Sequence, residues 1–375
     1  MNIGVDARSL LVEKKEGMHV YATNVLRQWA KSAPDHNFVL YVDGSVSAEL
    51  RSQFPSNFRL VILTPKHFWP QTRLTWHFLL TRGREFDVFY FPTQSMSLYC
   101  PKPTLAVIHD LAFIKFPNYF TAWNRFVLAN LTTNFTVKHA QKMICISQQT
   151  KRDVMGHYHV PEDKLEVIYH GYDQEQFFPR SPDEITVAKK QFGITGRYLI
   201  YLGTLQKRKN IVRLIEAYAQ LRADKQLEHQ LVIAGKRGWL YKDIFETVQK
   251  LHLEPYVVFT DYMPTATAAS LYSGSEAYIL PSLYEGFGMP VIEAMACGAP
   301  VIVSSAPPLP EIAGSAAEII NDPYRSESIA TAIWNVISNP KRQQDLKSAG
   351  LVQKNNYSWS KCAQATLAAI LSLRR

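Results

Sequence analysis

The chain has 375 residues, of which 47% are hydrophobic and 19% charged, and its formal net charge is +9. This length suits two domains better than one, and the composition is that of a globular protein, which excludes disordered and fibrous classes. The positive charge forms no basic tail or dense block along the sequence. It therefore indicates attraction to phosphates or an acidic membrane surface, and we expect no nucleic-acid partner.

Neither a secretory signal nor a membrane-spanning helix is expected. The first five residues run directly into a strand-like segment, without a basic region and a long apolar stretch before them. The apolar runs are far shorter than a membrane span. The cysteines Cys100, Cys145, Cys297 and Cys362 are scattered and form no CxxC pair, which favours reduced thiols over a disulfide frame or a zinc site. These features predict a cytoplasmic protein.

Strand-like apolar runs alternate with helix-length amphipathic segments from the first residues onward. Several runs are apolar at every position, as in parallel strands that are covered on both faces. Expected helices include 17–31 and 121–140. The expected strands of the first half are 3–6, 38–42, 60–63, 88–91, 105–108, 143–146 and 165–169.

The alternation pauses at 178–183, where two prolines and polar residues are typical of an interdomain connection. Helices are then expected at 210–221, with Asn210 as a candidate N-cap, and at 241–251. Two successive βα arrays predict two doubly wound parallel-sheet domains. The strands expected in the second half are 198–202, 230–234, 257–260, 277–280 and 300–303. We expect domains over 1–180 and 181–356, with a final helix over 357–375 that crosses back onto the first.

Small, cationic and polar residues follow the strands of the second half at their carboxyl ends. Open α/β sheets bind their ligands at those ends. A rim of this composition suits a ligand that contains a diphosphate. Its residues include Gly203, Thr204, Arg208, Lys209, Gly235, Lys236, Asp261 and Tyr262.

The richest segment is a glycine-containing loop that leads into a short helix. Gly286 and Gly288 allow the backbone to approach a ligand, and Pro290 suits the first helical turn, whose N–H groups can bind an anion. Glu285 and Glu293 can face the same cleft. A glycine-rich turn with two solvated glutamates is the alternative interpretation. The segment does not complete a GxGxxG motif, which argues against an oxidoreductase.

The pattern Glu285-x7-Glu293, within Glu-Gly-Phe-Gly-Met-Pro-Val-Ile-Glu-Ala-Met-Ala-Cys-Gly, resembles the signature of retaining glycosyltransferase family 4. The resemblance implies the GT-B fold: two Rossmann-like, doubly wound parallel-sheet domains that face each other across a cleft. The first would bind the acceptor and the second the nucleotide-sugar donor. Further matches cover almost the whole chain: Gly17, His109-Asp110-Leu111, Cys145-Ile146-Ser147, Gly203-Thr204-Leu205, Arg208-Lys209-Asn210, Pro281-Ser282 and Leu309-Pro310-Glu311.

The resemblance also implies roles for individual residues. Glu285 would hydrogen-bond the donor sugar, and Glu293 would hold the ribose. Lys209, assisted by Arg208, would neutralise the leaving diphosphate, and His109 would contact the sugar near the reacting carbon. His109, Lys209 and Glu285 are thus the expected catalytic residues. The other implied donor-binding residues are Gly17, Gly203, Thr204, Gly235, Lys236, Tyr262, Gly286, Phe287, Gly288 and Met289.

One departure from the family pattern concerns Thr204, where many relatives carry an arginine that contacts phosphate; Arg208 is the candidate replacement. No Asp-x-Asp motif occurs, so neither a metal site nor a cofactor is expected, and cations with a helix N-terminus can stabilise the leaving group instead. The implied reaction is a same-face substitution in which the leaving phosphate helps to deprotonate the acceptor. The paired glutamates are not a glycosidase pair, which requires carboxyl groups about 5–5.5 Å apart, because they are assigned to opposite ends of the donor.

The motif variants Gly-Thr-Leu…Arg-Lys-Asn and Gly-Lys-Arg-Gly-Trp resemble bacterial mannosyltransferases of surface-polysaccharide assembly. That resemblance implies hexosyl transfer to a glycan or lipid-linked acceptor, with GDP-mannose as the first donor hypothesis, ahead of UDP-glucose and UDP-N-acetylglucosamine. A sugar-nucleotide epimerase or isomerase is one alternative, although it would need acid–base residues over the sugar. A non-catalytic sugar-nucleotide-binding relative is another, although such a protein should have lost at least one of the four key residues His109, Lys209, Glu285 and Glu293.

The segment 66–84 interleaves aromatic and basic residues. Such a mixture can mark an element that lies on a membrane surface. The purely structural interpretation, which we favour, is a helix that packs its aromatic residues on the sheet. A peripheral contact with an anionic membrane, at its inner face, is therefore kept as a hypothesis. The residues concerned are Lys66, Phe68, Trp69, Arg73, Trp76, Phe78, Arg82 and Arg84.

Overall fold

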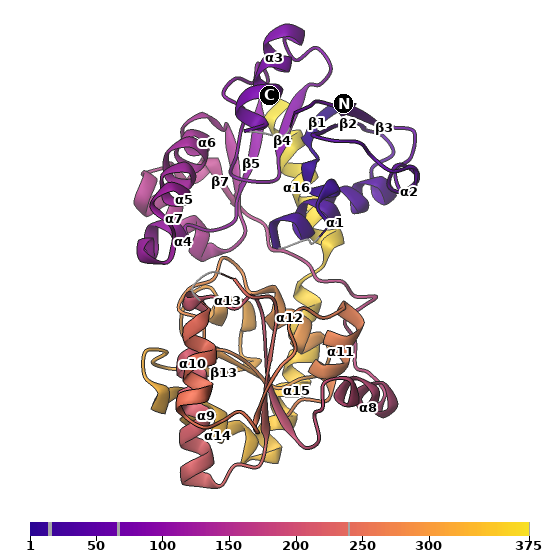
Figure 1. Ribbon diagram of the computed structural model, residues 1–375. Helices are drawn as coiled ribbons and strands as arrows, with labels where there is room; N and C mark the ends of the chain where they lie inside the picture. The colour runs from indigo at the N-terminus through magenta and orange to yellow at the C-terminus, as the bar shows by residue number, and fades with distance from the viewer. Residues whose placement is uncertain (14–16, 66–67, 239–240, 375) are drawn as a thin grey trace. The chain divides into compact units, whose positions relative to one another are not determined.

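The computed structural model describes residues 1–13, 17–65, 68–238 and 241–374 and divides the chain into two compact units (Figure 1). The first unit comprises Met1–Gly171 and Trp359–Arg375, and the second comprises Tyr172–Ser358. Each unit is built around one parallel sheet that is flanked by helices (Figure 1). Lys66 and Trp239, which belong to two of the predicted motifs, lie outside the described residues.

The first sheet has seven parallel strands in the order β3-β2-β1-β4-β5-β6-β7. The strand order reverses between β1 and β4, and ligands of open α/β sheets bind at such a switch point. The strands are β1 (Asn2–Asp6), β2 (Asn37–Val42), β3 (Phe58–Ile62), β4 (Val88–Phe91), β5 (Thr104–Ile108), β6 (Lys142–Cys145) and β7 (Leu165–Val167).

The second sheet has six parallel strands in the order β10-β9-β8-β11-β12-β13, with its switch point between β8 and β11. Strand β8 pairs with β9 from Tyr198↔Gln230 to Leu202↔Ala234, so both strands end at the same edge. The strands are β8 (Tyr198–Leu202), β9 (Gln230–Ala234), β10 (Val257–Phe259), β11 (Ala277–Leu280), β12 (Val301–Ser304) and β13 (Ala317–Ile320).

Helices connect the strands in both units, as expected for right-handed parallel crossovers. The α-helices of the first unit are α1 (Gly17–Ser32), α2 (Ala48–Ser52), α3 (Thr75–Thr81), α4 (Ala112–Lys115), α5 (Ala122–Phe126), α6 (Asn134–His139), α7 (Gln148–Tyr158) and α16 (Trp359–Leu371). Those of the second are α8 (Pro182–Gln191), α9 (Ile211–Lys225), α10 (Lys242–Lys250), α11 (Thr265–Ser273), α12 (Met289–Ala296), α13 (Leu309–Ala313), α14 (Ser326–Ile337) and α15 (Pro340–Gln353). Among the described residues, no helix combines the length and the apolar character needed to cross a bilayer.

Most predicted elements are confirmed; helix α9 extends to Lys225, beyond the expected 210–221, and there are three further differences. All expected strands are present to within two residues, whereas β13 was not predicted, because a glutamate interrupts the apolar run in its four-residue sequence Ala-Glu-Ile-Ile. The expected helix 121–140 is divided into α5 and α6 by a π-helical segment, Val127–Thr133. The unit boundary at Gly171 precedes the proline-containing segment at 178–183. Residues between the two positions pack on the second unit: Lys354 Nζ donates to Tyr172 Oη at 3.3 Å, and the ring of Phe177 lies 6.3 Å from that of Tyr272.

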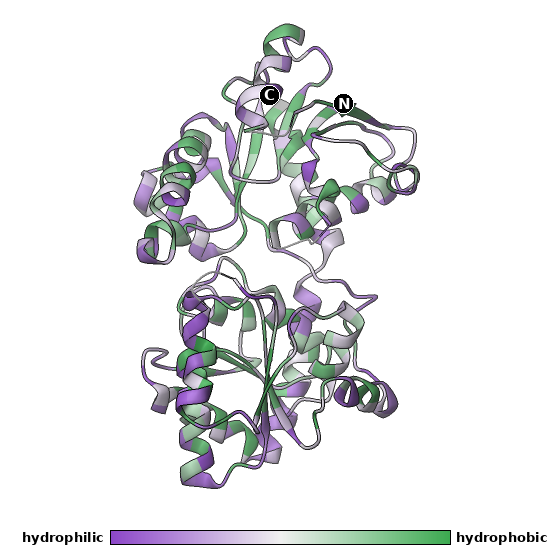
Figure 2. Cartoon of the chain, in the orientation of Figure 1, coloured by the Kyte–Doolittle hydropathy of each residue, from purple (hydrophilic) through white to green (hydrophobic). Residues whose placement is uncertain are grey.

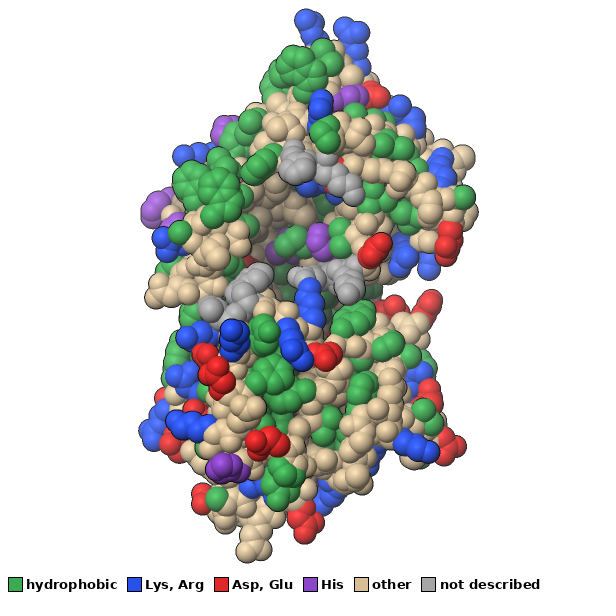
Figure 3. Space-filling model, viewed as in Figure 1, with side chains coloured by type: hydrophobic (Ala, Val, Ile, Leu, Met, Phe, Trp, Pro, Cys, Tyr) green, Lys and Arg blue, Asp and Glu red, His purple; other side chains and the backbone are tan. Residues whose placement is uncertain are grey.

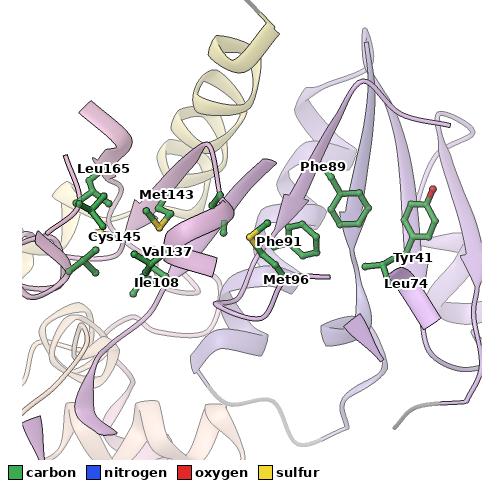
Figure 4. Close-up of a cluster of buried hydrophobic side chains, with 14 of the residues drawn as sticks. Tyr41, Leu74, Phe89, Phe91, Met96, Ile108, Val137, Met143, Cys145 and Leu165 are labelled. Atoms are coloured by element: carbon green, nitrogen blue, oxygen red, sulfur yellow. The ribbon is translucent and has the colours of Figure 1, made fainter. Parts of the chain in front are cut away.

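The core of the first unit lies between the sheet and its helices. The apolar strands stand out as the hydrophobic parts of both sheets (Figure 2). In the first unit, side chains of β2, β4, β5 and β6 form a buried cluster with Leu74 and Val137 (Figure 4). Helix α16 packs against α1, and Trp29 Nε1 of α1 donates to the Ala363 carbonyl of α16 at 2.8 Å. The last helix is thus part of the first unit, although it follows the second in sequence.

Candidate active site

A buried carboxylate and two cations meet at the switch point of the second sheet. Arg208 and Lys209 follow β8, and Glu285 follows β11. Lys209 Nζ donates to Glu285 Oε1 at 2.5 Å, and Arg208 Nη1 donates to Glu285 Oε2 at 3.1 Å. Ser282 Oγ donates to Glu285 Oε1 at 2.7 Å. The structure therefore brings together the three charged residues that the sequence analysis assigned to the sugar and the diphosphate.

Asn210 fixes the loop that carries the two cations. It adopts a left-handed conformation with φ 62°, and its side chain makes no N-cap hydrogen bond, so the expectation that it caps the following helix was wrong. Its amide Nδ2 instead donates to the carbonyls of Pro281, at 3.1 Å, and Pro323, at 2.6 Å. The side chain thereby ties the loop after β8 to the loop after β11 and holds Lys209 beside Glu285.

The charge state of Glu285 follows from its surroundings. Burial alone would raise the pKa of this carboxyl, but the charges of Lys209 and Arg208, with hydrogen bonds from Lys209 and Ser282, lower it to about 2. The site therefore combines one carboxylate with two cations near neutral pH. It carries a net positive charge that can stabilise an anionic ligand.

The loops after β8 and β9 approach each other closely at two glycines. The Gly203 N–H donates to the Ala234 carbonyl at 2.9 Å, and the Leu205 N–H donates to the Lys236 carbonyl at 2.9 Å. A Cβ atom added at Gly235 would lie 2.1 Å from the Gly203 carbonyl oxygen, and Gly235 has φ 137°. Only glycine fits there without strain. The half-buried Thr204 and Lys236 lie on the same two loops.

The loop after β11 leads into α12 as predicted. Gly288 is its N-cap with φ 98°, and Pro290 lies in the first turn. Gly286, Phe287 and Gly288 are buried, whereas Met289 is half-buried. Because the first N–H groups of a helix lack partners within it, this end of α12 can bind an anion.

Glu293 lies one turn into α12 and is half-buried. Burial, together with the nearby charge of Asp173, raises the pKa of this carboxyl to about 7. Glu285 and Glu293 thus have opposite pKa shifts within one short segment. A carboxyl that titrates near neutral pH is typical of a functional site.

Asp261 and Tyr262 follow β10 at the same edge of the second sheet. Both are exposed, and Arg237 Nε lies 3.4 Å from Asp261 Oδ1. The Gly235 N–H donates to the Asp261 carbonyl at 2.9 Å, so this loop is continuous with the loops after β8 and β9. Tyr262 is therefore on the rim where the sequence analysis placed it.

His109 and Gly17 belong to the first unit. His109 follows β5 and is buried; its ring Nε2 bonds the Pro92 carbonyl at 2.8 Å. Since a carbonyl only accepts, Nε2 carries the proton, and Nδ1 holds the lone pair of the neutral ring. Burial lowers the pKa of His109 and favours that neutral form. Gly17 is the first residue of α1.

Sequence reasoning missed three residues beside these sites. His170 lies beyond β7 and is buried, with its ring 5.8 Å from the ring of His109; Tyr21 of α1 stacks on His170 at 4.8 Å. Burial lowers the pKa of His170 well below its ordinary value. The strand-end rule that found His109 could also have found His170, which directly follows the expected strand 165–169; β7 itself ends at Val167. Asp173, the third missed residue, does not stand at the end of an expected strand or in a motif.

Within the described part of the chain, no group of three or more His, Cys, Asp or Glu side chains could hold a metal ion.

Comparisons with known proteins match the two units separately. A family model for glycosyltransferase family 4 matches residues 16–176, and a model for glycosyl transferases group 1 matches residues 184–352. The chain is 26% identical over 266 residues to the O-antigen chain mannosyltransferase B of Escherichia coli, which covers 71% of this chain and 69% of that protein. It is also 26% identical over 281 residues to the serotype-specific mannosyltransferase WbdA of Escherichia coli, covering 71% of this chain but only 33% of WbdA.

The fold has a solved counterpart in Anabaena Alr3699/HepE in complex with UDP-glucose. The two chains share 19% identity and a TM-score of 0.77, and the match covers 99% of each. The expected GT-B fold class is thus confirmed. Together, the two family models and the two sheets lead to one conclusion: the chain belongs to the glycosyltransferases, with a family 4 domain followed by a group 1 domain.

Proposed function

We propose that this glycosyltransferase transfers mannose from GDP-mannose to a glycan or lipid-linked acceptor in surface-polysaccharide assembly, with retention of the anomeric configuration. The observation that carries the proposal is the cluster of Arg208, Lys209 and Glu285 at the switch point of the second sheet. The two Escherichia coli relatives, which are named as mannosyltransferases, support the choice of sugar. The donor base and the linkage are part of the proposal.

The roles of the residues follow from their placement. In this proposal the second unit holds the donor: Lys209 and Arg208 neutralise the leaving diphosphate, Glu285 accepts hydrogen bonds from the sugar, and Glu293 holds the ribose. Backbone groups at the N-terminus of α12, and at Gly203 and Gly235 where the two loops approach each other, would contact the donor. The remaining contacts proposed are those of Gly17, Thr204, Lys236, Tyr262, Gly286, Phe287, Gly288 and Met289.

The first unit would bind the acceptor, and His109 would contact the sugar at the reacting end. Its Nδ1 lone pair can accept a hydrogen bond from a sugar hydroxyl, because Nε2 is committed to Pro92. No side chain is assigned as the base, since the leaving phosphate can take the acceptor proton. The cations of the second unit would stabilise the leaving group without a metal. The protein would act in the cytoplasm, at the inner face of the membrane.

The direct test is a transfer assay with purified protein, labelled GDP-mannose, UDP-glucose and UDP-N-acetylglucosamine, and acceptor glycolipid extracted from cells. We expect incorporation from GDP-mannose, an α-linked product by NMR, and full activity in the presence of EDTA. Epimerised or isomerised nucleotide sugar without any transfer product would favour the epimerase alternative. Nucleotide binding without turnover would favour the non-catalytic one.

A further inference from the structure

The first unit presents an exposed apolar surface around helix α3. Six large hydrophobic side chains on and beside this helix are between 40% and 69% exposed. We call this surface the α3 face; it consists of Phe68, Trp76, Leu79, Leu80, Leu98 and Tyr99. Hydrophobic side chains gather over α3, with Lys and Arg side chains close by (Figure 3). Contiguous exposed apolar side chains rimmed by polar residues mark interaction sites.

Helical spacing places the apolar side chains of α3 on opposite faces. Trp76, Leu79 and Leu80 are spaced i, i+3 and i+4 and lie on the solvent face, whereas Phe78 is buried in the core cluster. The helix was expected to pack its aromatic residues on the sheet. The structure buries Trp69 and Phe78 and leaves Phe68 and Trp76 exposed. The expected helix is shorter than 66–84: Phe68 and Trp69 precede a π-helical segment, Pro70–Leu74, and α3 begins only at Thr75.

The α3 face is held in place from beneath. The Leu98 N–H donates to Thr75 Oγ1 at 2.8 Å, which fastens the loop with Leu98 and Tyr99 against the helix. His77 Nε2, on the inner side of α3, bonds Glu85 at 2.7 Å, and Tyr41 Oη donates to the same carboxylate at 2.7 Å. The exposed apolar side chains therefore sit on a fixed support and are not a frayed segment.

Arginine side chains rim the α3 face. The sequence 66–84, which includes α3, contains Lys66, Arg73, Arg82 and Arg84 and no Asp or Glu. Arg73, Arg82 and Arg84 are exposed, and none of them forms an ion pair with a described acidic residue. The nearby acid Glu85 is already paired with Arg59, at 2.8 Å, and with His77. The cationic rim is thus left uncompensated.

A cavity of about 490 Å³ opens beside the helix. Arg73 and Trp76 line it together with Gln71, Thr72, Thr75 and Pro65. A cation, an indole and hydroxyl groups around one small cavity suit a phosphate-bearing headgroup.

We propose that the α3 face docks the protein on an anionic lipid bilayer, with Trp76, Leu79 and Leu80 in the headgroup region and Arg73, Arg82 and Arg84 on lipid phosphates. Aromatic and leucine side chains rimmed by arginine are typical of surfaces that lie in the membrane interface. A second copy of the chain is a poor occupant, because it would bring the same arginines face to face. This docking rests on the proposed function and deepens it, since it would bring the enzyme to a lipid-linked acceptor.

The test is co-sedimentation of the full chain with lipid vesicles, without donor or acceptor, so that its result is independent of sugar transfer. Neutral phosphatidylcholine vesicles are compared with vesicles in which a third of the lipid is phosphatidylglycerol, at low and at high salt. We expect binding to the anionic vesicles only, weakened by salt. Leu79→Glu/Leu80→Glu and Arg73→Glu/Arg84→Glu should each lower the bound fraction about tenfold.

Two control variants introduce the same number of glutamates on the second unit, in place of exposed apolar or basic residues. Val187→Glu/Val352→Glu alters two exposed valines, and Lys190→Glu/Lys250→Glu alters two exposed lysines; both should bind vesicles like the wild type. The proposal is overturned if the wild type stays in the supernatant with anionic vesicles, or if the α3 variants bind as well as their controls. It is also overturned if sedimentation velocity shows a dimer that only Leu79→Glu/Leu80→Glu dissociates, because a second copy would then cover this face. Failure of vesicle binding with intact transfer to a soluble acceptor would overturn the docking and leave the proposed function standing.

Discussion

Lys209 and Glu285 are 76 residues apart in sequence, yet Lys209 Nζ bonds Glu285 Oε1 at 2.5 Å. The pair joins the loop after β8 to the loop after β11 at the point where the strand order of the second sheet reverses. A buried pair of this kind stabilises the protein only weakly, because both charges lose their hydration. Its position at the switch point, where open α/β sheets bind ligands, instead indicates a functional role.

Replacement of Lys209 tests the role of this cation. Lys209→Ala removes a charge that would stabilise the leaving diphosphate, and we expect kcat/KM to fall about 100- to 1000-fold in steady-state transfer assays. Lys207→Ala is the matched control, since Lys207 is exposed in the same loop and should be dispensable. Equal activity of the two variants would remove Lys209 from the mechanism.

The raised pKa of Glu293 predicts a pH-dependent stability. In the unfolded chain this carboxyl ionises near its ordinary value of 4.5, whereas in the folded protein it holds its proton up to about 7. The stability that this carboxyl contributes is therefore complete below pH 4.5. As the pH rises towards 7, the free energy of unfolding falls by at most about 3 kcal/mol. Melting temperatures of the wild type and Glu293→Gln should converge at low pH and separate towards pH 7, with the wild type lower.

Asp173→Asn provides the companion experiment for Glu293. Removing the neighbouring negative charge should lower the pKa of Glu293 and reduce the loss of stability between pH 4.5 and 7. The amide oxygen that this substitution introduces can still accept the backbone hydrogen bonds that Asp173 Oδ1 accepts from Glu175 and Gln176. Identical melting profiles for Asp173→Asn and the wild type would contradict the assignment.

The contact between Gly203 and Gly235 predicts a severe effect of one added methyl group. In Gly235→Ala, the Cβ atom would meet the Gly203 carbonyl oxygen, and φ 137° is unfavourable for alanine. We expect the free energy of unfolding to fall by about 3 kcal/mol, measured by urea denaturation. Gly196→Ala is the control, because a Cβ there meets nothing within 4 Å and its φ is ordinary. A Gly235→Ala variant as stable as Gly196→Ala would show that the two loops do not approach in this way.

The two-sheet fold could be predicted because parallel strands such as β8 and β11 are covered on both faces and read as continuous apolar runs. Strand β13 was not predicted because its four residues, Ala317–Ile320, include a glutamate that interrupts the apolar run. The division of the helix 121–140 has no marker in the sequence, since neither Pro nor Gly occurs there.

The site residues were found for a different reason. Strand ends and the Glu285-x7-Glu293 pattern locate groups along the chain, but they do not say which groups touch. The pairing of Lys209 with Glu285 depends on the turn of Asn210, whose side chain could equally have capped the helix. Likewise, the opposite pKa shifts of Glu285 and Glu293 arise from burial and from charged neighbours, such as Asp173, that are distant in sequence.

The central claim, that the second unit is a nucleotide-sugar donor site, is tested most directly by thermal-shift measurements with GDP, UDP, ADP and their sugar conjugates. A ligand that binds only the folded state stabilises it by mass action and so raises the melting temperature. At a ligand concentration of about 100 times Kd, the free energy of unfolding rises by about 2.7 kcal/mol. We predict a clear shift with GDP and GDP-mannose that is lost in both Lys209→Ala and Glu293→Ala. The claim would be contradicted if no nucleotide shifted the melting temperature of the wild type, or if both variants showed the same shift as the wild type.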